Sequence, residues 1–118
     1  MKIKNAEVIN YLNKSDLHDL PINMMELFFE KKEILFEFEN WNEEKKDYIP
    51  FEMKLYNVTL FEINNYGENE FQVEELLEVN CKELNDRQFE AIFKFHKGAG
   101  KALWQINIIF SEIEVIYK

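Results

Sequence analysis

Hydrophobic and polar residues alternate one for one along several stretches of this chain. The alternation is clearest over residues 33–39, where every second residue is Ile or Phe and three glutamates stand between them, and it recurs over residues 51–55. Successive side chains of a β-strand point to opposite faces of a sheet, so the pattern predicts strands with one face in a core and the other in water. We expect the following residues to be buried: Phe36, Phe38, Phe51, Leu55, Phe93, Trp104 and Ile106.

The same reasoning divides the chain into one helix and a series of strands. A short amphipathic helix is predicted over about Asn5–Leu12, and strands over Asn23–Glu30, Glu33–Trp41, Tyr48–Ile63, Arg87–His96, Ala102–Phe110 and Ile113–Tyr117. The third of these is too long for one regular strand, and its apolar positions change phase, so we place a bulge or break at Tyr56-Asn57. The apolar positions of residues 71–84 are compatible with either a strand or one face of a helix, and we favour the strand. The glycines of Lys97–Lys101 predict a hairpin loop.

Together these elements predict a mainly β member of the α+β class. We expect residues 1–118 to form one domain, with a short N-terminal helix followed by six or seven mostly antiparallel strands. Some segments, such as Leu27-Phe28-Phe29 and Ile108-Ile109-Phe110, are apolar on both faces. The sheet is therefore expected to be sandwich-like or strongly curled.

Composition supports a folded protein of a reducing compartment. Apolar residues make up 47% of the 118 residues, which is ample for a core without disulfides. The single cysteine, Cys81, has no partner for an intramolecular disulfide. No apolar run approaches the roughly 18 residues of a membrane span, and no apolar stretch follows Met1–Glu7 as in a secretion signal. A cytoplasmic location is therefore expected.

The charge balance limits the kind of partner. The chain has 23 acidic and 14 basic residues, a net charge of −9, which disfavours nucleic acids and anionic membranes and favours a basic protein. Acids are concentrated between Glu62 and Glu83, where the only base is Lys82. The candidate partner-binding residues from this segment are Glu68, Glu70, Glu74, Glu75 and Glu78. The alternative is that this charge serves solubility.

No motif in the chain predicts catalysis, a cofactor or a metal. Cys81 as a nucleophile would need an activating histidine, and a core cysteine is the simpler interpretation. Asp16, His18 and Asp19 are close in sequence, but a metal site needs further ligands. We expect the His18-Asp19 pair to stabilise the corner between the helix and the first strand. In this role an aspartate caps backbone N–H groups and His18 bridges to a neighbouring strand.

The chain resembles small immunity-type proteins of bacterial polymorphic toxin systems. The resemblance is carried by Leu17-His18-Asp19, the hairpin Met24–Glu39, the segment Phe51–Val58 with Leu60, and the late strand Leu103–Ile108. It implies a non-catalytic protein that neutralises a toxin by binding it. In this chain the partner would be basic.

Two other functions remain open. The first is a small ligand-binding or enzymatic domain with an aromatic pocket lined by Trp41, Tyr48, Tyr66 and Trp104. The second is a housekeeping domain. A large pocket with convergent polar groups would favour the ligand-binding or enzymatic domain, and a shallow acidic surface would favour the binding protein.

Overall fold

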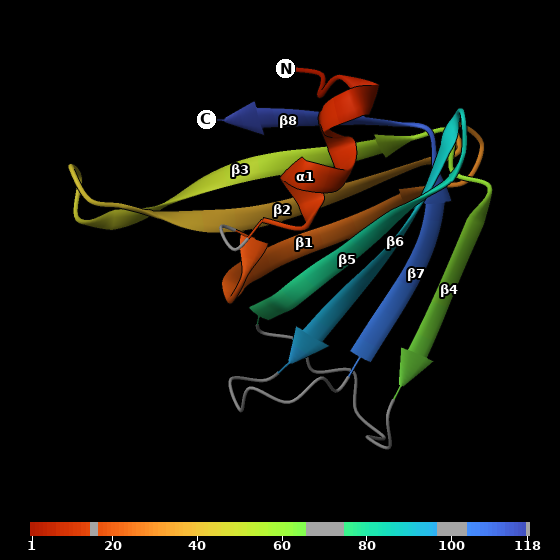
Figure 1. Cartoon of the computed structure of the whole chain (residues 1–118). Helices are drawn as coiled ribbons and strands as arrows, with labels where there is room; N and C mark the ends of the chain where they lie inside the picture. The colour runs from red at the N-terminus through yellow and green to blue at the C-terminus, as the bar shows by residue number, and fades with distance from the viewer. Residues whose placement is uncertain (15–16, 66–74, 97–103, 118) are drawn as a thin grey trace.

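The computed structural model describes residues 1–14, 17–65, 75–96 and 104–117, and consists of a short helical segment followed by eight strands (Figure 1). The helical segment is a single 3-10 turn, η1 (Asn5–Glu7), which continues into the helix α1 (Val8–Leu12). The strands are β1 (Leu20–Phe28), β2 (Glu33–Asn42), β3 (Asp47–Tyr56), β4 (Leu60–Asn65), β5 (Glu75–Asn85), β6 (Gln88–His96), β7 (Trp104–Phe110) and β8 (Glu112–Tyr117).

All eight strands belong to one antiparallel sheet with the order β4-β7-β6-β5-β1-β2-β3-β8. The predicted class is confirmed, and the strand count is one more than the upper expectation of seven. The extra strand arises because the long segment predicted over Tyr48–Ile63 is two strands, β3 and β4, which pair with different neighbours. The chain breaks where predicted: Asn57 has a φ of 56°, a left-handed conformation that asparagine tolerates better than most residues.

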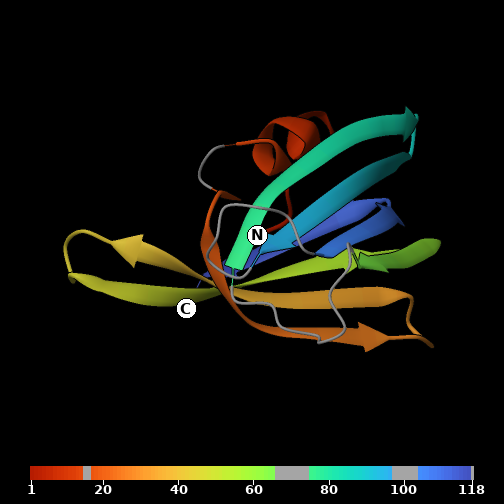
Figure 2. The same cartoon turned by 90° about the horizontal axis from the view of Figure 1, so that it is seen from below.

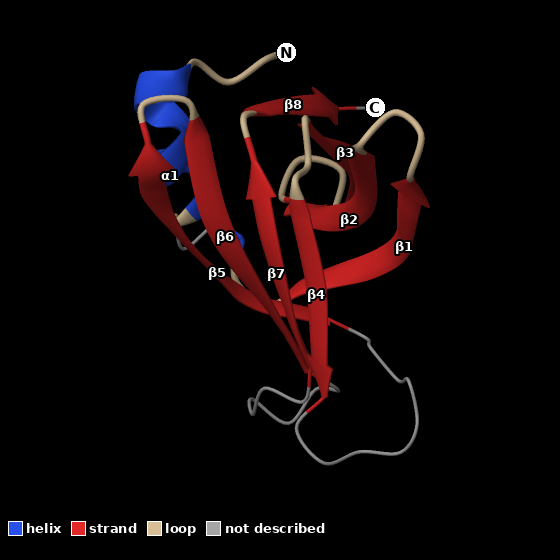
Figure 3. Cartoon of the chain, turned by 90° about the vertical axis from the view of Figure 1, so that its right-hand side faces the viewer, coloured by secondary structure: helices blue, strands red, loops and turns tan. Residues whose placement is uncertain are grey.

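The sheet is strongly curled, so that its two halves face each other (Figures 2 and 3). We call β1-β2-β3-β8 the first half-sheet and β5-β6-β7-β4 the second; they are joined by the short pairing of Leu20 and Pro21 with the start of β5. Phe36 on β2 stacks on Phe93 of β6 with ring centroids 4.8 Å apart, although β5 and β1 lie between these strands in the sheet order. Only a curled sheet permits that contact.

A single hydrophobic cluster fills the space between the half-sheets. All seven residues predicted to be buried belong to it: Phe36, Phe38, Phe51, Leu55, Phe93, Trp104 and Ile106. The alternation in sequence therefore identified the inward faces of β2, β3, β6 and β7 correctly. Residues 75–84 of the ambiguous segment lie in β5, whereas residues 71–74 and the predicted hairpin loop lie outside the described residues.

The N-terminal segment connects the edges of the two half-sheets. Residues 1–3 pair with β8, where the Ile3 N–H donates to the Ile113 carbonyl at 3.0 Å. The other end of the segment reaches β5: the side-chain amide of Asn13 donates to the Cys81 carbonyl at 3.0 Å and accepts from the Cys81 N–H at 2.7 Å. Between these contacts α1 buries Val8 and Leu12 in the core.

Candidate partner-binding surface

The outward side of the first half-sheet is rich in glutamates. The inward positions of its strands are occupied by the buried residues, so the residues between them point away from the core. We call this outward surface the acidic face. Its glutamates are Glu26, Glu33, Glu37, Glu39, Glu52, Glu112 and Glu114. Within the described residues, the strands of this face carry one lysine, Lys54.

Sheet pairing places some of these carboxylates directly beside one another. Glu37 of β2 faces Glu52 of β3 in register, and like charges in directly opposed positions destabilise a sheet. On the outward side of the second half-sheet, by contrast, two of the glutamates pair with lysines: Glu78 with Lys94 at 3.4 Å, and Glu90 with Lys82 at 3.3 Å. Among the described strands, the larger excess of negative charge therefore lies on the outward side of the first half-sheet.

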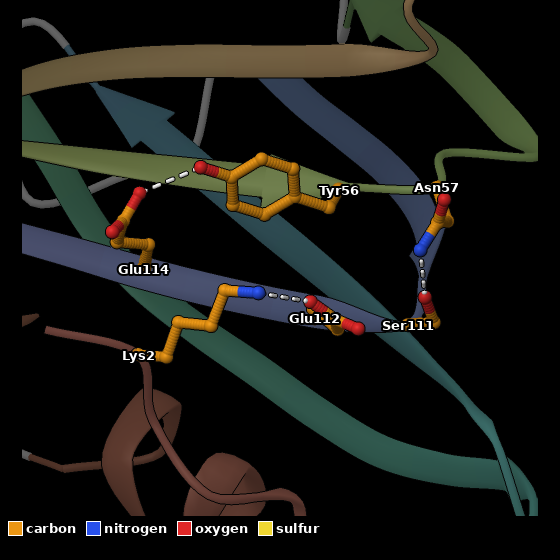
Figure 4. A network of polar contacts seen from close by, with 6 residues as sticks. All are labelled: Lys2, Tyr56, Asn57, Ser111, Glu112 and Glu114. Carbon is orange, nitrogen blue, oxygen red and sulfur yellow. Dashed lines mark hydrogen bonds and ion pairs between the residues drawn. The ribbon is translucent and has the colours of Figure 1, made fainter.

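Cations and a phenol engage the carboxylates at one end of the acidic face (Figure 4). The Tyr56 hydroxyl donates to Glu114 at 2.6 Å, and Lys2 pairs with Glu112 at 3.0 Å. Lys54 pairs with Glu33 at 3.1 Å. The hydrogen bond from Tyr56 lowers the pKa of Glu114, and the same hydrogen bond, with burial and nearby carboxylates adding to it, raises the pKa of Tyr56 to about 12.

At the other end of the acidic face, the glutamates lie beside a neutral amide. β1 has a bulge between Ile22 and Met24, which places Asn23 as an extra residue. Its side-chain amide donates to Glu37 at 3.1 Å and to Glu39 at 3.3 Å. A neutral amide orders these carboxylates without neutralising their charge.

This end of the face continues onto a projecting hairpin arm. In the described residues, β1 pairs with β2 only as far as Phe38 and β8 pairs with β3 only from Phe51. Residues 39–50 therefore form a two-stranded ribbon, which extends beyond the rest of the sheet (Figures 1 and 2). Trp41 and Tyr48 face each other on this arm, in the same alternation phase as Glu37 and Glu39. They are exposed, with relative exposures of 49% and 48%.

Two of the five glutamates proposed from the sequence are described by the structure, and both lie away from the acidic face. Glu75 and Glu78 lie on β5, in the second half-sheet, and both have basic neighbours on β6. Glu78 pairs with Lys94, and the Glu75 carboxylate lies 3.6 Å from the buried His96. β6 thus places one basic residue beside each of these two glutamates, although no base is near them in the linear sequence except Lys82. The other three, Glu68, Glu70 and Glu74, lie outside the described residues.

The His18-Asp19 pair lies at the corner where the half-sheets join. His18 Nδ1 lies 2.8 Å from an Asp19 carboxylate oxygen, and the other oxygen of this carboxylate lies 3.2 Å from His96 Nε2 on β6. The Asp19 N–H donates to the Leu77 carbonyl at 3.3 Å. The bridge to a neighbouring strand is therefore made by Asp19, not by His18 as we expected from the sequence. Asp16 lies outside the described residues.

Neither a reactive thiol nor a metal site is found in the described part of the chain. Burial raises the pKa of the Cys81 thiol to about 12, so at neutral pH this residue is a protonated core side chain. The described histidines, cysteine and acids form no cluster able to hold a metal ion.

The aromatic residues predicted to line one pocket are dispersed. Trp104 is in the core and borders a pocket of about 200 Å³, together with Ile22, Met25 and Phe95. Trp41 and Tyr48 are on the hairpin arm, and Tyr66 lies outside the described residues. The pocket beside Trp104 is apolar and smaller than the roughly 300–1,000 Å³ of most ligand sites.

The acidic face is not marked by any run of acids in the sequence, although its central glutamates belong to the alternating stretch 33–39. The missed residues alternate singly with apolar residues along four strands. A count of charges at outward strand positions would have found Glu33, Glu37, Glu39 and Glu52.

A scan against models of protein families found no match, and searches of curated proteins and of solved structures found none either. Among the helices that the structure describes, none is long and apolar enough to cross a lipid bilayer.

Proposed function

We propose that this protein is a non-catalytic binding protein whose acidic face docks onto a basic surface of another protein. The observation that carries the proposal is the gathering of seven glutamates on one outward face, where the described strands hold a single lysine. Such a face attracts a basic partner over a distance and raises the association rate. The register places Glu37 and Glu52 opposite each other, an arrangement of like charges that is understandable if the charge serves binding.

An immunity-type role is the form of this function that the sequence resemblance suggests. The protein would then cover a basic surface of a toxin made by the same cell and so block it. A rigid, curled sheet suits this role because the charges are already arranged before binding, which lowers the entropic cost of association.

The test is a kinetic binding measurement with a double charge reversal. The protein is used to capture partners from cells that carry its gene, and association with a captured basic protein is measured at low and high salt. We expect Glu37→Lys with Glu52→Lys to lower the association rate about tenfold or more, and high salt to lower the wild-type rate similarly.

The matched control reverses two exposed glutamates away from the acidic face, Glu62→Lys with Glu83→Lys. Both double variants change the net charge equally, so a much smaller effect of the control would assign the attraction to the acidic face. An association rate unaffected by salt and by reversal of Glu37 and Glu52 would contradict the proposal. A third variant, Glu75→Lys with Glu78→Lys, tests the surface inferred from sequence alone.

A further inference from the structure

The hairpin arm carries an exposed aromatic pair, Trp41 and Tyr48. The rings of Trp41 and Tyr48 have centroids 5.3 Å apart and meet at 72°, an edge-to-face arrangement. This contact stabilises a ribbon that has no further strand beside it in the described residues, and isolated two-stranded ribbons are marginal by themselves. An edge-to-face pair still leaves one ring face available to a partner.

A hydrogen bond from the Trp41 indole favours the binding of a cation to its ring. The indole Nε1–H donates to the Glu43 carboxylate at 3.1 Å. Donation to an anion enriches the π face of the indole in electron density, which strengthens its attraction for a positive charge. The hydrogen bonds from Lys46 and from Trp41 lower the pKa of Glu43, so this carboxylate is ionised at neutral pH.

A carboxylate beside the pair adds a second element of recognition. Glu39 lies on the same face as Trp41, two residues along β2, whereas the two oxygens of Glu43 are engaged by the Trp41 indole and by Lys46. A planar guanidinium can stack on an aromatic face and donate a pair of hydrogen bonds to a carboxylate at the same time, which a lysine ammonium cannot do as well. Arginine is therefore the cation that suits this combination of groups.

We propose that Trp41 and Tyr48, with Glu39 beside them, form a site for an arginine side chain of the basic partner. This inference rests on the proposed function and deepens it, because it names the residue type that the arm recognises. Binding surfaces concentrate their energy in a few tryptophan, tyrosine and arginine side chains, with weaker polar contacts around them. The arm supplies the aromatic contribution, and the acidic face supplies the surrounding charge.

The test uses a hexaarginine peptide with blocked ends as the probe, at low salt. The chain has two tryptophans, so its amide NMR spectrum contains two indole N–H peaks, and Trp41→Phe identifies which belongs to Trp41. We expect the peptide to shift the Trp41 peak and to leave the peak of the buried Trp104 in place. Trp41→Ala should weaken peptide binding about tenfold, and Trp41→Phe, which keeps an aromatic ring, should weaken it less.

Two controls separate aromatic recognition from general attraction. Phe29, which is 82% exposed in the turn at the opposite end of β2, should be replaceable by Ala without loss of binding. A hexalysine peptide of equal charge should bind several-fold more weakly than hexaarginine.

Three results would overturn the inference. If Trp41→Ala leaves hexaarginine binding unchanged while reversal of Glu37 and Glu52 weakens it, the arm is not the arginine site and the proposed function stands. If hexalysine and hexaarginine bind equally, the site recognises charge alone. If neither peptide binds, the arginine site and the acidic docking face both fail.

Discussion

Single residues on the acidic face combine two tasks, holding strands together and presenting charge. Tyr56 shows this most clearly, because its hydroxyl links β3 to Glu114 on β8, while its ring lies under the Nζ atoms of Lys54 at 5.4 Å and Lys2 at 5.6 Å. These cations lie over one end of the face. The end toward the hairpin arm is ordered by Asn23 instead. The two ends of the acidic face therefore differ in their partners, with cations at one end and a neutral amide at the other.

The raised pKa of Tyr56 makes stability depend on alkaline pH. The unfolded chain releases this proton near the usual phenol pKa of about 10, whereas the folded protein holds it to about 12. The contribution is therefore complete below about pH 10 and is lost as the pH rises toward 12. We expect the free energy of unfolding, measured by urea titration, to fall less steeply over this range in Tyr56→Phe than in the wild type. Equal slopes in the two proteins would show that the hydrogen bond to Glu114 does not form.

At the scale of elements, the N-terminal segment stabilises the molecule by covering strand edges. Residues 1–3 pair with β8, and Asn13 pairs with the backbone of β5 as a neighbouring strand would. Exposed edges invite pairing with other chains, so this arrangement protects two of them. α1 has only five residues and would be marginal alone, and its formation depends on burying Val8 and Leu12.

Asn13→Ala should destabilise the protein by about 1–3 kcal/mol, because it leaves the N–H and carbonyl of Cys81 without these hydrogen bonds. Asn10→Ala on the same helix is the matched control. Asn10 is exposed, so its replacement should change the free energy of unfolding by less than about 0.5 kcal/mol. Urea titration measures both. A loss for Asn13→Ala no larger than for the control would mean that the helix docks through its apolar contacts alone.

At the scale of the whole molecule, the described charges are distributed unequally between the two half-sheets. In the second half-sheet the outward Glu78 and Glu90 pair with lysines, while the first half-sheet places Glu37 directly opposite Glu52. A net charge of −9 also opposes the compact state through self-repulsion.

Salt should therefore stabilise this protein. We expect sodium chloride at physiological concentration to raise the free energy of unfolding by up to about 1 kcal/mol relative to very low salt, since screening weakens the repulsion. The free energy of unfolding should rise less with salt in the variant Glu37→Lys with Glu52→Lys than in the variant Glu62→Lys with Glu83→Lys. Thermal unfolding at several salt concentrations decides this. Stability that is constant or falls with salt would show that ion pairs outweigh repulsion.

The amino-acid sequence by itself determined which residues lie in the core and where most strands run. Side chains such as Phe36, Phe38 and Phe93 are inward because the alternation has the period of a strand, a local property that needs no knowledge of neighbours. The break at Asn57 could also be predicted from the sequence, because a change of phase within one strand is a local property.

Only the tertiary structure decided which charges share a face. β3 lies beside β8, more than fifty residues away in sequence, which brings Glu112 and Glu114 to the surface that Glu37 and Glu52 occupy. β6 lies beside β5, which brings Lys94 to Glu78, a pairing that the linear charge count does not reveal. Strand order and register depend on long-range packing across the curl, such as that of Phe36 against Phe93, and such contacts leave no periodic signal in the sequence.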